Sequence, residues 1–253
     1  VVSRARLQDY DEQFGFTRRR GVTAANAVKM LLQRRATAAG SVVCRSCFDL
    51  QEAFPSLGHS ALWESVVDVE GQAGHALRTL ARSCMEAEVD VSFLGGAAPA
   101  SEEGGEEGSQ ILYARAGVRQ GDTGGPGMFK FAFARVLETL QTALDQRGLG
   151  HLFGFVDGSQ GVGWAEVPAN LIVYADDTDS FAVLPAGASS GQISAALGGM
   201  ELAFQECLEP WGMQLNAKKT EHMARPRGRG SAEVARQLIV STAGDGRHGP
   251  RLT

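Results

Sequence analysis

The sequence predicts a chain of the α+β class, in which a mostly antiparallel sheet is backed by helices. Short apolar runs alternate with helical patterns but lack the regular strand-helix-strand rhythm of a parallel sheet. Two such runs, 171–173 and 181–184, flank a short polar turn, which is typical of a β-hairpin. Pro126 suits the first turn of a long helix, because that turn leaves its N–H groups unpaired anyway.

The first half of the chain is expected to alternate between helices and strands. Thr23 is the expected N-cap of a helix reaching about residue 35, and a strand follows over 41–50. Paired strands are expected at 89–94 and 111–116, and the Gly- and Glu-rich connection 95–109 is expected to be disordered. The expected apolar faces of the helices are Ala25, Val28, Leu31 and Leu32, then Leu62, Trp63, Val66 and Val67, then Leu77, Leu80, Ala81 and Cys84.

The second half is expected to hold two longer helices on either side of the hairpin. A Gly-rich loop is expected near 158–163, and Pro210 should end the second helix. Residues 226–230 form a basic, Gly-rich stretch, and 238–240 is expected to be a closing strand. The apolar positions of the two helices are Phe129, Phe133, Leu137, Leu140 and Leu144, then Ile193, Leu197, Met200, Phe204 and Leu208.

Charge is distributed unevenly along the 253 residues. Residues 1–35 and residues 218–253 each hold eight basic and three acidic residues, a net charge of +5 at each end. The middle carries −15, because the whole chain has a net charge of −5. Basic ends around an acidic centre suit an enzyme that grips phosphates at its periphery and concentrates carboxylates for metal ions.

Composition excludes several classes of protein. Four cysteines are too few for a disulfide scaffold, and Cys44 and Cys47 point to opposite faces of a strand, which argues against zinc. The five histidines show no ligand spacing. No apolar stretch is long enough to span a membrane, and the N-terminus has no apolar signal region, so we expect an intracellular, soluble protein.

Four stretches occur in the order of the palm motifs A to D of reverse transcriptases, and they resemble the non-LTR retrotransposon type. A block like the one that precedes motif A in that family begins at Gln13-Phe14-Gly15-Phe16 and continues to Arg20. The resemblance covers about residues 13–223. The four stretches are Cys47-Phe48-Asp49-Leu50-Gln51-Glu52-Ala53-Phe54, Gly117-Val118-Arg119-Gln120-Gly121-Asp122, Tyr174-Ala175-Asp176-Asp177 and Gly212-Met213-Gln214-Leu215-Asn216-Ala217-Lys218-Lys219-Thr220.

This resemblance implies a right-hand palm and a two-metal polymerase chemistry. Asp49 and Asp176 would bridge two Mg²⁺ ions, for which Mn²⁺ could substitute, with Asp177 as a helper. Lys219 matches the lysine that protonates the leaving pyrophosphate. The implied partners are an RNA template, a DNA primer and a dNTP.

The resemblance also implies residues that bind the nucleotide and the template. Phe54 stands where the family closes off the sugar 2′ position, and Gln120-Gly121 matches the motif B loop that contacts template and nucleotide. Arg20 would contact the template or the triphosphate. Two departures concern fine positioning, since the family commonly has Ser before Pro126 and Asp at Pro55. A third, Thr17 in place of a usual arginine, weakens the case for phosphate contacts in the N-terminal block.

We expect one domain over 1–253, with a part close to the fingers at 1–40, a palm at 41–225 and a basic loop and strand at 226–253. Full fingers and thumb are expected to lie outside the chain, which should therefore polymerise weakly or not at all by itself. Ala175 and Phe54 argue against a viral RNA-dependent RNA polymerase. Two alternatives stay open: a group II intron maturase and a non-catalytic retroelement remnant.

Overall fold

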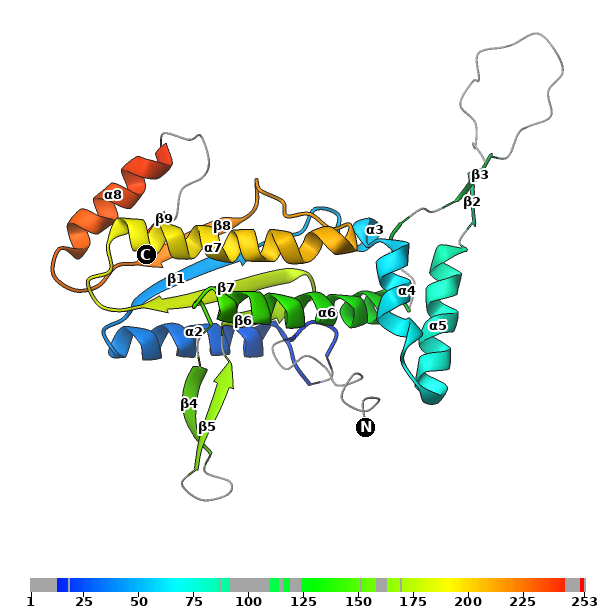
Figure 1. The fold of residues 1–253 in the computed structure, drawn as a ribbon, viewed down its shortest axis with the longest axis horizontal. Helices are drawn as coiled ribbons and strands as arrows, with labels where there is room; N and C mark the ends of the chain where they lie inside the picture. The colour runs from blue at the N-terminus through cyan, green and yellow to red at the C-terminus, as the bar shows by residue number, and fades with distance from the viewer. Residues whose placement is uncertain are drawn as a thin grey trace, which may run out of the picture.

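A five-stranded sheet forms the centre of the molecule (Figure 1). The computed structural model describes residues 13–17, 19–86, 88–91, 110–113, 116–118, 124–150, 152–157, 163–168, 170–243 and 251–252. The strand order is β6 (Leu171–Tyr174), β7 (Asp177–Leu184), β1 (Val42–Phe48), β8 (Glu221–Arg225) and β9 (Arg251–Leu252). All neighbours are antiparallel except β8 and β9, which confirms the expected mostly antiparallel sheet.

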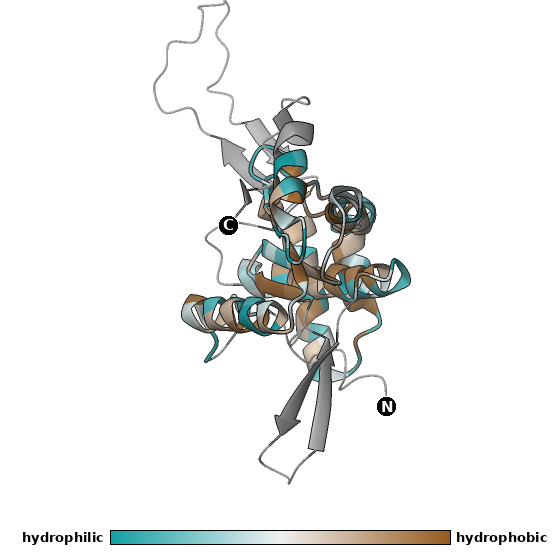
Figure 2. Cartoon of the chain, turned by 90° about the vertical axis from the view of Figure 1, so that its left-hand side faces the viewer, coloured by the Kyte–Doolittle hydropathy of each residue, from teal (hydrophilic) through white to brown (hydrophobic). Residues whose placement is uncertain are grey.

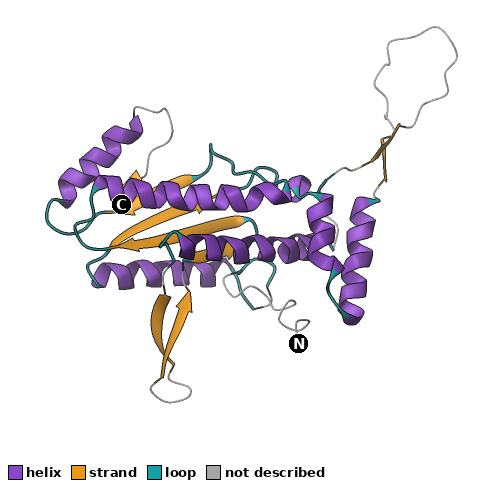
Figure 3. Ribbon diagram, viewed as in Figure 1, coloured by secondary structure: helices purple, strands orange, loops and turns teal. Residues whose placement is uncertain are grey.

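Helices cover both faces of this sheet (Figures 1 and 3). α2 (Val22–Ala38) packs on one face, while α6 (Gly125–Gln146) and α7 (Ser190–Leu208) pack together on the other. The remaining described elements are α3 (Ala53–Ser56), α4 (His59–Val67) and α5 (Gly71–Met85) beside α6, η1 (Glu209–Trp211) after α7, α8 (Ser231–Ala243), and the two-stranded pairs β2 (Glu88–Val91) with β3 (Gln110–Tyr113) and β4 (Leu152–Asp157) with β5 (Gly163–Pro168).

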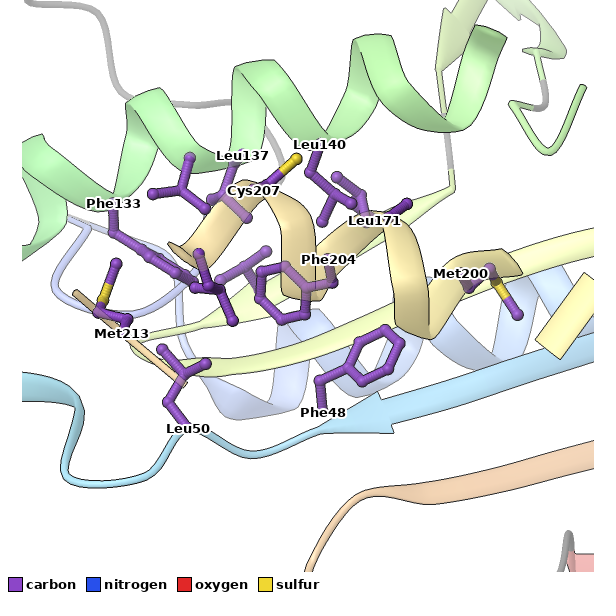
Figure 4. Close-up of a cluster of buried hydrophobic side chains, with 14 of the residues drawn as sticks. Phe48, Leu50, Phe133, Leu137, Leu140, Leu171, Met200, Phe204, Cys207 and Met213 are labelled. Atoms are coloured by element: carbon purple, nitrogen blue, oxygen red, sulfur yellow. The ribbon is translucent and has the colours of Figure 1, made fainter. Parts of the chain in front are cut away.

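Most of the core lies between the sheet and the α6–α7 pair. Side chains alternate along a strand, so Val42, Cys44 and Phe48 of β1 belong to this core while Val43 packs under α2. Hydrophobic residues accordingly gather at the centre of the molecule (Figure 2). Both predicted apolar faces of the long helices are confirmed, because all ten of their positions are buried. Figure 4 shows three of these residues on α6 close to α7: Phe133, Leu137 and Leu140 lie near Phe204 and Cys207.

The apolar face predicted for α2 is partly wrong. Ala25 and Leu32 are buried as expected, but Leu31 is 57% exposed and Ala36 takes its place in the contact with the sheet. In this rotation of the helix, Lys29 lies on the buried stripe and pairs with a buried aspartate of β7, Asp179. The helix also begins earlier than predicted, with Gly21 as the N-cap instead of Thr23.

The closing strand predicted at 238–240 is wrong, since these residues belong to helix α8. Val234 and Leu238 are four residues apart, so they share one side of a helix, and both pack on the core. The pair β4–β5 was not predicted. Residues 92–109 and 158–162, which include most of the two expected loops, lie outside the described residues. Among the described residues, no helix has the length and hydrophobicity needed to cross a membrane.

Candidate active site at the tip of the β6–β7 hairpin

A two-residue turn, Ala175-Asp176, joins β6 to β7 and confirms the predicted hairpin. Tyr174 and Asp177 form the last cross-strand pair before the turn. Ala175 has a φ of 60°, whereas Asp176 does not have a positive φ, which is the pattern of a type II′ turn. The turn therefore holds two consecutive carboxylates at one end of the sheet.

Strand pairing brings Asp49 to the same end of the sheet. β1 lies beside β7 with Phe48 opposite Thr178, so the next residue, Asp49, continues alongside Asp177. On its other side, the carbonyl of Asp49 accepts a hydrogen bond of 2.8 Å from the backbone N–H of Asn216. Asp49 is therefore held between the hairpin and the loop that leads into β8.

The charge of Asp49 influences the ionisation of the two hairpin carboxylates, Asp176 and Asp177. Burial is the largest cause that raises the pKa of Asp176; a backbone hydrogen bond lowers it, the charge of Asp49 raises it and that of Lys219 lowers it. Burial also raises the pKa of Asp177, and the charges of Asp176 and Asp49 raise it further. Mutual repulsion of this kind is relieved when a cation binds among the carboxylates.

One oxygen of Asp49 suits the coordination of a cation. Its Oδ2 is buried without a hydrogen-bond partner, and it forms an ion pair with the Lys219 Nζ at 3.4 Å. A buried carboxylate oxygen that accepts no hydrogen bond costs free energy, which a divalent cation would recover more fully than one lysine at this distance. Within the described part of the chain, no three His, Cys, Asp or Glu side chains are already arranged to hold a metal ion. The shared metal site stays a prediction, which this donor set fits.

Sequence comparison decides the family. The family model described as "Reverse transcriptase (RNA-dependent DNA polymerase)" matches residues 2–237. The chain belongs to the reverse transcriptase family. No curated protein sequence matches it.

The fold of this reverse transcriptase chain is similar to telomerase. Apo telomerase from Candida tropicalis, truncated from the C-terminal domain, superposes with a TM-score of 0.53 at 14% identity over 86% of this chain. Telomerase from Candida albicans in complex with the TWJ fragment of telomeric RNA superposes with a TM-score of 0.44 at 11% identity over 83% of this chain. The first likeness supports the predicted polymerase palm. The chain spans 37% and 32% of the two telomerase chains, respectively.

Lys219 lies beside Asp49 at the edge of the acidic cluster. It ends a turn in which its backbone N–H donates to the carbonyl of Asn216 at 3.0 Å. Its side chain is 68% exposed, yet the amine still reaches Asp49. A cation at this place is accessible to a negatively charged substrate.

Phe54 lies close to the same end of the sheet, within a stack of aromatic rings. Its ring stacks on Phe129 of α6 at a centroid distance of 4.6 Å and meets the edge of the exposed Phe16 at 6.3 Å. Its backbone carbonyl accepts a hydrogen bond of 2.9 Å from Val118, which holds the start of motif B beside it. Gln120 and Gly121, the predicted motif B residues, lie outside the described residues.

Arg20 packs against the N-terminal segment that borders the hairpin. Its guanidinium lies 5.6 Å from the centre of the Phe14 ring, and its Nη1 donates to the Gln13 carbonyl at 3.5 Å. Phe14 in turn donates a backbone hydrogen bond of 2.7 Å to Val173 of β6. The structure thus brings Arg20 to this side of the hairpin.

The sequence analysis missed a buried ionic cluster two residues beyond Asp177. Asp179 is 4% exposed and pairs with Lys29 of α2 and with Arg45 of β1, whose Nη2 lies 2.6 Å from its Oδ1. Cys47 donates its thiol to the same oxygen at 3.0 Å. A charged residue in each of two apolar strands was the available indication. The cluster fixes the strands that carry the carboxylates.

Proposed function

We propose that this chain carries the catalytic centre of an RNA-directed DNA polymerase. The enzyme would join a dNTP to the 3′-hydroxyl of a DNA primer that is paired with an RNA template. The observation that carries the proposal is the buried Oδ2 of Asp49 beside the Asp176-Asp177 hairpin, which has no hydrogen-bond partner and forms an ion pair with the amine of Lys219 at 3.4 Å. Membership of the reverse transcriptase family supports the same chemistry.

Asp49 and Asp176 would hold two Mg²⁺ ions, or Mn²⁺ in their place, with Asp177 as a supporting carboxylate. Both ions prefer carboxylate oxygens as ligands. When bound, the ions lower the pKa of the primer hydroxyl and stabilise the charge that develops on the triphosphate. Burial of Asp176 and its repulsion by Asp49, which raise its pKa, give the apo site a preference for a bound cation.

The side chains around the carboxylates would complete the reaction. The primer 3′-hydroxyl gives its proton to water, and its oxygen forms a bond to the α-phosphorus while the bond between this phosphorus and the pyrophosphate oxygen breaks. The ammonium group of Lys219 gives a proton to the pyrophosphate, and its exposure leaves room for the triphosphate beside it. Phe54 would lie under the sugar and exclude a 2′-hydroxyl. Arg20 and the Gln120-Gly121 loop would contact the triphosphate and the template.

We further propose a setting in a non-LTR retrotransposon-like element. The support is the type of the four motifs and of the block that begins at Gln13. The site would then copy the RNA of the parent element into DNA.

Metal binding and nucleotide addition together test the proposal. The chain is titrated with Mn²⁺ and followed by electron paramagnetic resonance, then assayed for dTMP addition to oligo(dT) on poly(rA). Asp49→Asn and Asp176→Asn should each weaken Mn²⁺ binding by about 10-fold or more and abolish addition. Asp68→Asn is the control, because Asp68 is an exposed acid at the end of α4, and it should behave like wild type.

Two outcomes would overturn the proposal. One is a wild-type chain that neither binds Mn²⁺ nor adds a nucleotide at micromolar concentration. The other is an Asp49→Asn chain with wild-type Mn²⁺ affinity and rate of nucleotide addition, since the Asp49 carboxylate would then have no part in the site.

A further inference from the structure

The N-terminal segment lies directly against the turn that carries the acidic pair. Gln13 forms a parallel bridge with Val173 of β6, and the N–H of Phe14 donates to the Val173 carbonyl at 2.7 Å. Gln13 is only 2% exposed, although a glutamine is usually at the surface. A buried amide must find partners for its donor and acceptor groups, so its position is specific.

The side-chain amide of Gln13 bonds both backbone groups of Ala175. Its Oε1 accepts from the N–H of Ala175 at 3.0 Å and from the N–H of Gly15 at 2.8 Å. Its Nε2 donates to the carbonyl of Ala175 at 3.0 Å. One planar group thus fixes the peptide planes before and after Ala175, and the second of these planes is shared with Asp176.

The clamp acts on a turn whose first residue has an unfavourable backbone conformation. Ala175 has a φ of 60°, a left-handed conformation that disfavours a residue with a Cβ atom. The segment can approach the turn only because residue 15 is glycine: a Cβ there would lie 2.1 Å from the Ala175 nitrogen. The amide hydrogen bonds are the polar contacts that hold Ala175 in this conformation from outside the hairpin.

We propose that Gln13 is a positioning residue for the polymerase site. By holding both peptide planes of Ala175, it sets the direction of the Asp176 side chain toward Asp49. The inference rests on the proposed function, since it concerns how the metal-binding carboxylate of that site is aimed. Glutamine suits the task because it offers an acceptor and a donor without a charge, whereas glutamate would add a negative group beside Asp176.

The test compares Gln13→Met with Gln192→Met in the full chain. Methionine keeps the length of the side chain but leaves the two backbone groups of Ala175 without the amide. Gln192 also bonds a backbone N–H, that of Ser189 at 2.9 Å, but it does so at the start of α7, beyond the other end of β7. Both variants lose a glutamine-to-backbone contact, so the control accounts for a general loss of stability.

Three readouts are taken at a temperature well below both melting transitions. Relative to Gln192→Met, the Gln13→Met chain should bind Mn²⁺ about 10-fold more weakly and show a kcat about 10-fold lower for dTMP addition, with the KM for dTTP little changed. Amide hydrogen exchange of residues 171–178 should be about 10-fold faster. A merely structural role would lower the melting temperature without separating kcat from KM.

The outcomes separate this inference from the proposed function. If wild type binds Mn²⁺ and Gln13→Met equals Gln192→Met in all three readouts, the clamp is refuted and the proposed function stands. If wild type neither binds Mn²⁺ nor adds a nucleotide, the proposed function fails. In that case hydrogen exchange alone judges the clamp, and equal exchange in the two variants refutes it.

Discussion

Replacing Gly15 with alanine should push the N-terminal segment away from the hairpin. A Cβ at this position would lie 2.1 Å from the Ala175 nitrogen, 2.7 Å from its Cα and 3.0 Å from the Tyr174 carbonyl carbon. All three atoms belong to the backbone, so no side chain can rotate away to make room. Non-bonded heavy atoms need about 3.5 Å, so the two segments must separate by more than about 1 Å.

The cost follows from the hydrogen bonds that this separation breaks. Three hydrogen bonds cross the contact. The Phe14 N–H donates to the Val173 carbonyl, the Ala175 N–H donates to the Gln13 Oε1, and the Gln13 Nε2 donates to the Ala175 carbonyl. Each contributes about 1 kcal/mol net, or about 3 kcal/mol together. Alanine restricts the unfolded chain and returns about 0.4–1 kcal/mol, because the φ of Gly15 is not positive. The expected loss in the free energy of unfolding is about 2–3 kcal/mol.

Urea denaturation followed by circular dichroism measures this loss. Gly127→Ala is the matched control, since nothing lies within 4 Å of a Cβ at this helical position, and it should stabilise the chain by roughly 0.5–1 kcal/mol. Gly15→Ala should also weaken Mn²⁺ binding, because the turn moves. A Gly15→Ala chain within about 0.5 kcal/mol of wild type, with unchanged Mn²⁺ affinity, would show that the close approach is unimportant.

Three further predictions concern other parts of the site and the core. Phe54→Val should relax discrimination against ribonucleotides by roughly tens to hundreds of fold, because in the proposed site the ring that stacks on Phe129 lies under the sugar. Equal losses of kcat/KM for a dNTP and for the matching rNTP would make Phe54 a packing residue only. Ala175→Gly should raise the free energy of unfolding by up to about 1 kcal/mol in urea, since glycine adopts a φ of 60° without strain, and a destabilised variant would contradict this. Burial raises the pKa of Cys44 to about 12, so at pH 9 roughly one folded molecule in a thousand carries the thiolate. The thiol of the unfolded chain ionises at lower pH than the folded one, so the free energy of unfolding should fall between about pH 9 and 12. Mass-spectrometric mapping of alkylation at pH 8 should find native Cys44 unmodified and urea-unfolded Cys44 modified, and rapid native modification would disprove its burial.

Patterns over short distances predicted much of the fold correctly. The strand at β1, the hairpin at β6–β7 and the faces of α6 and α7 follow from local spacing, because a helix or hairpin repeats its contacts within a few residues. The error at 238–240 has the same origin. Three apolar residues in a row suit a buried strand or a helix equally well, and only the structure shows that Val234 and Leu238 pack on the core from one side of α8.

The sequence alone was sufficient to show the family's four motifs, the acidic pair at the tip of a hairpin and the α+β class, since each depends on residue order and on neighbours along the chain. Only the tertiary structure decided how distant groups meet. The motifs implied that Asp49 and Asp176 meet although 127 positions separate them, but the means is the register of β1 against β7, which brings Asp49 alongside Asp177. The hydrogen bonds of Gln13 to Ala175 span 162 positions, and the pairing of Lys29 with Asp179 depends on how α2 is rotated on the sheet. Such contacts depend on strand register and helix packing, which are set by the whole core and leave no local pattern in the sequence.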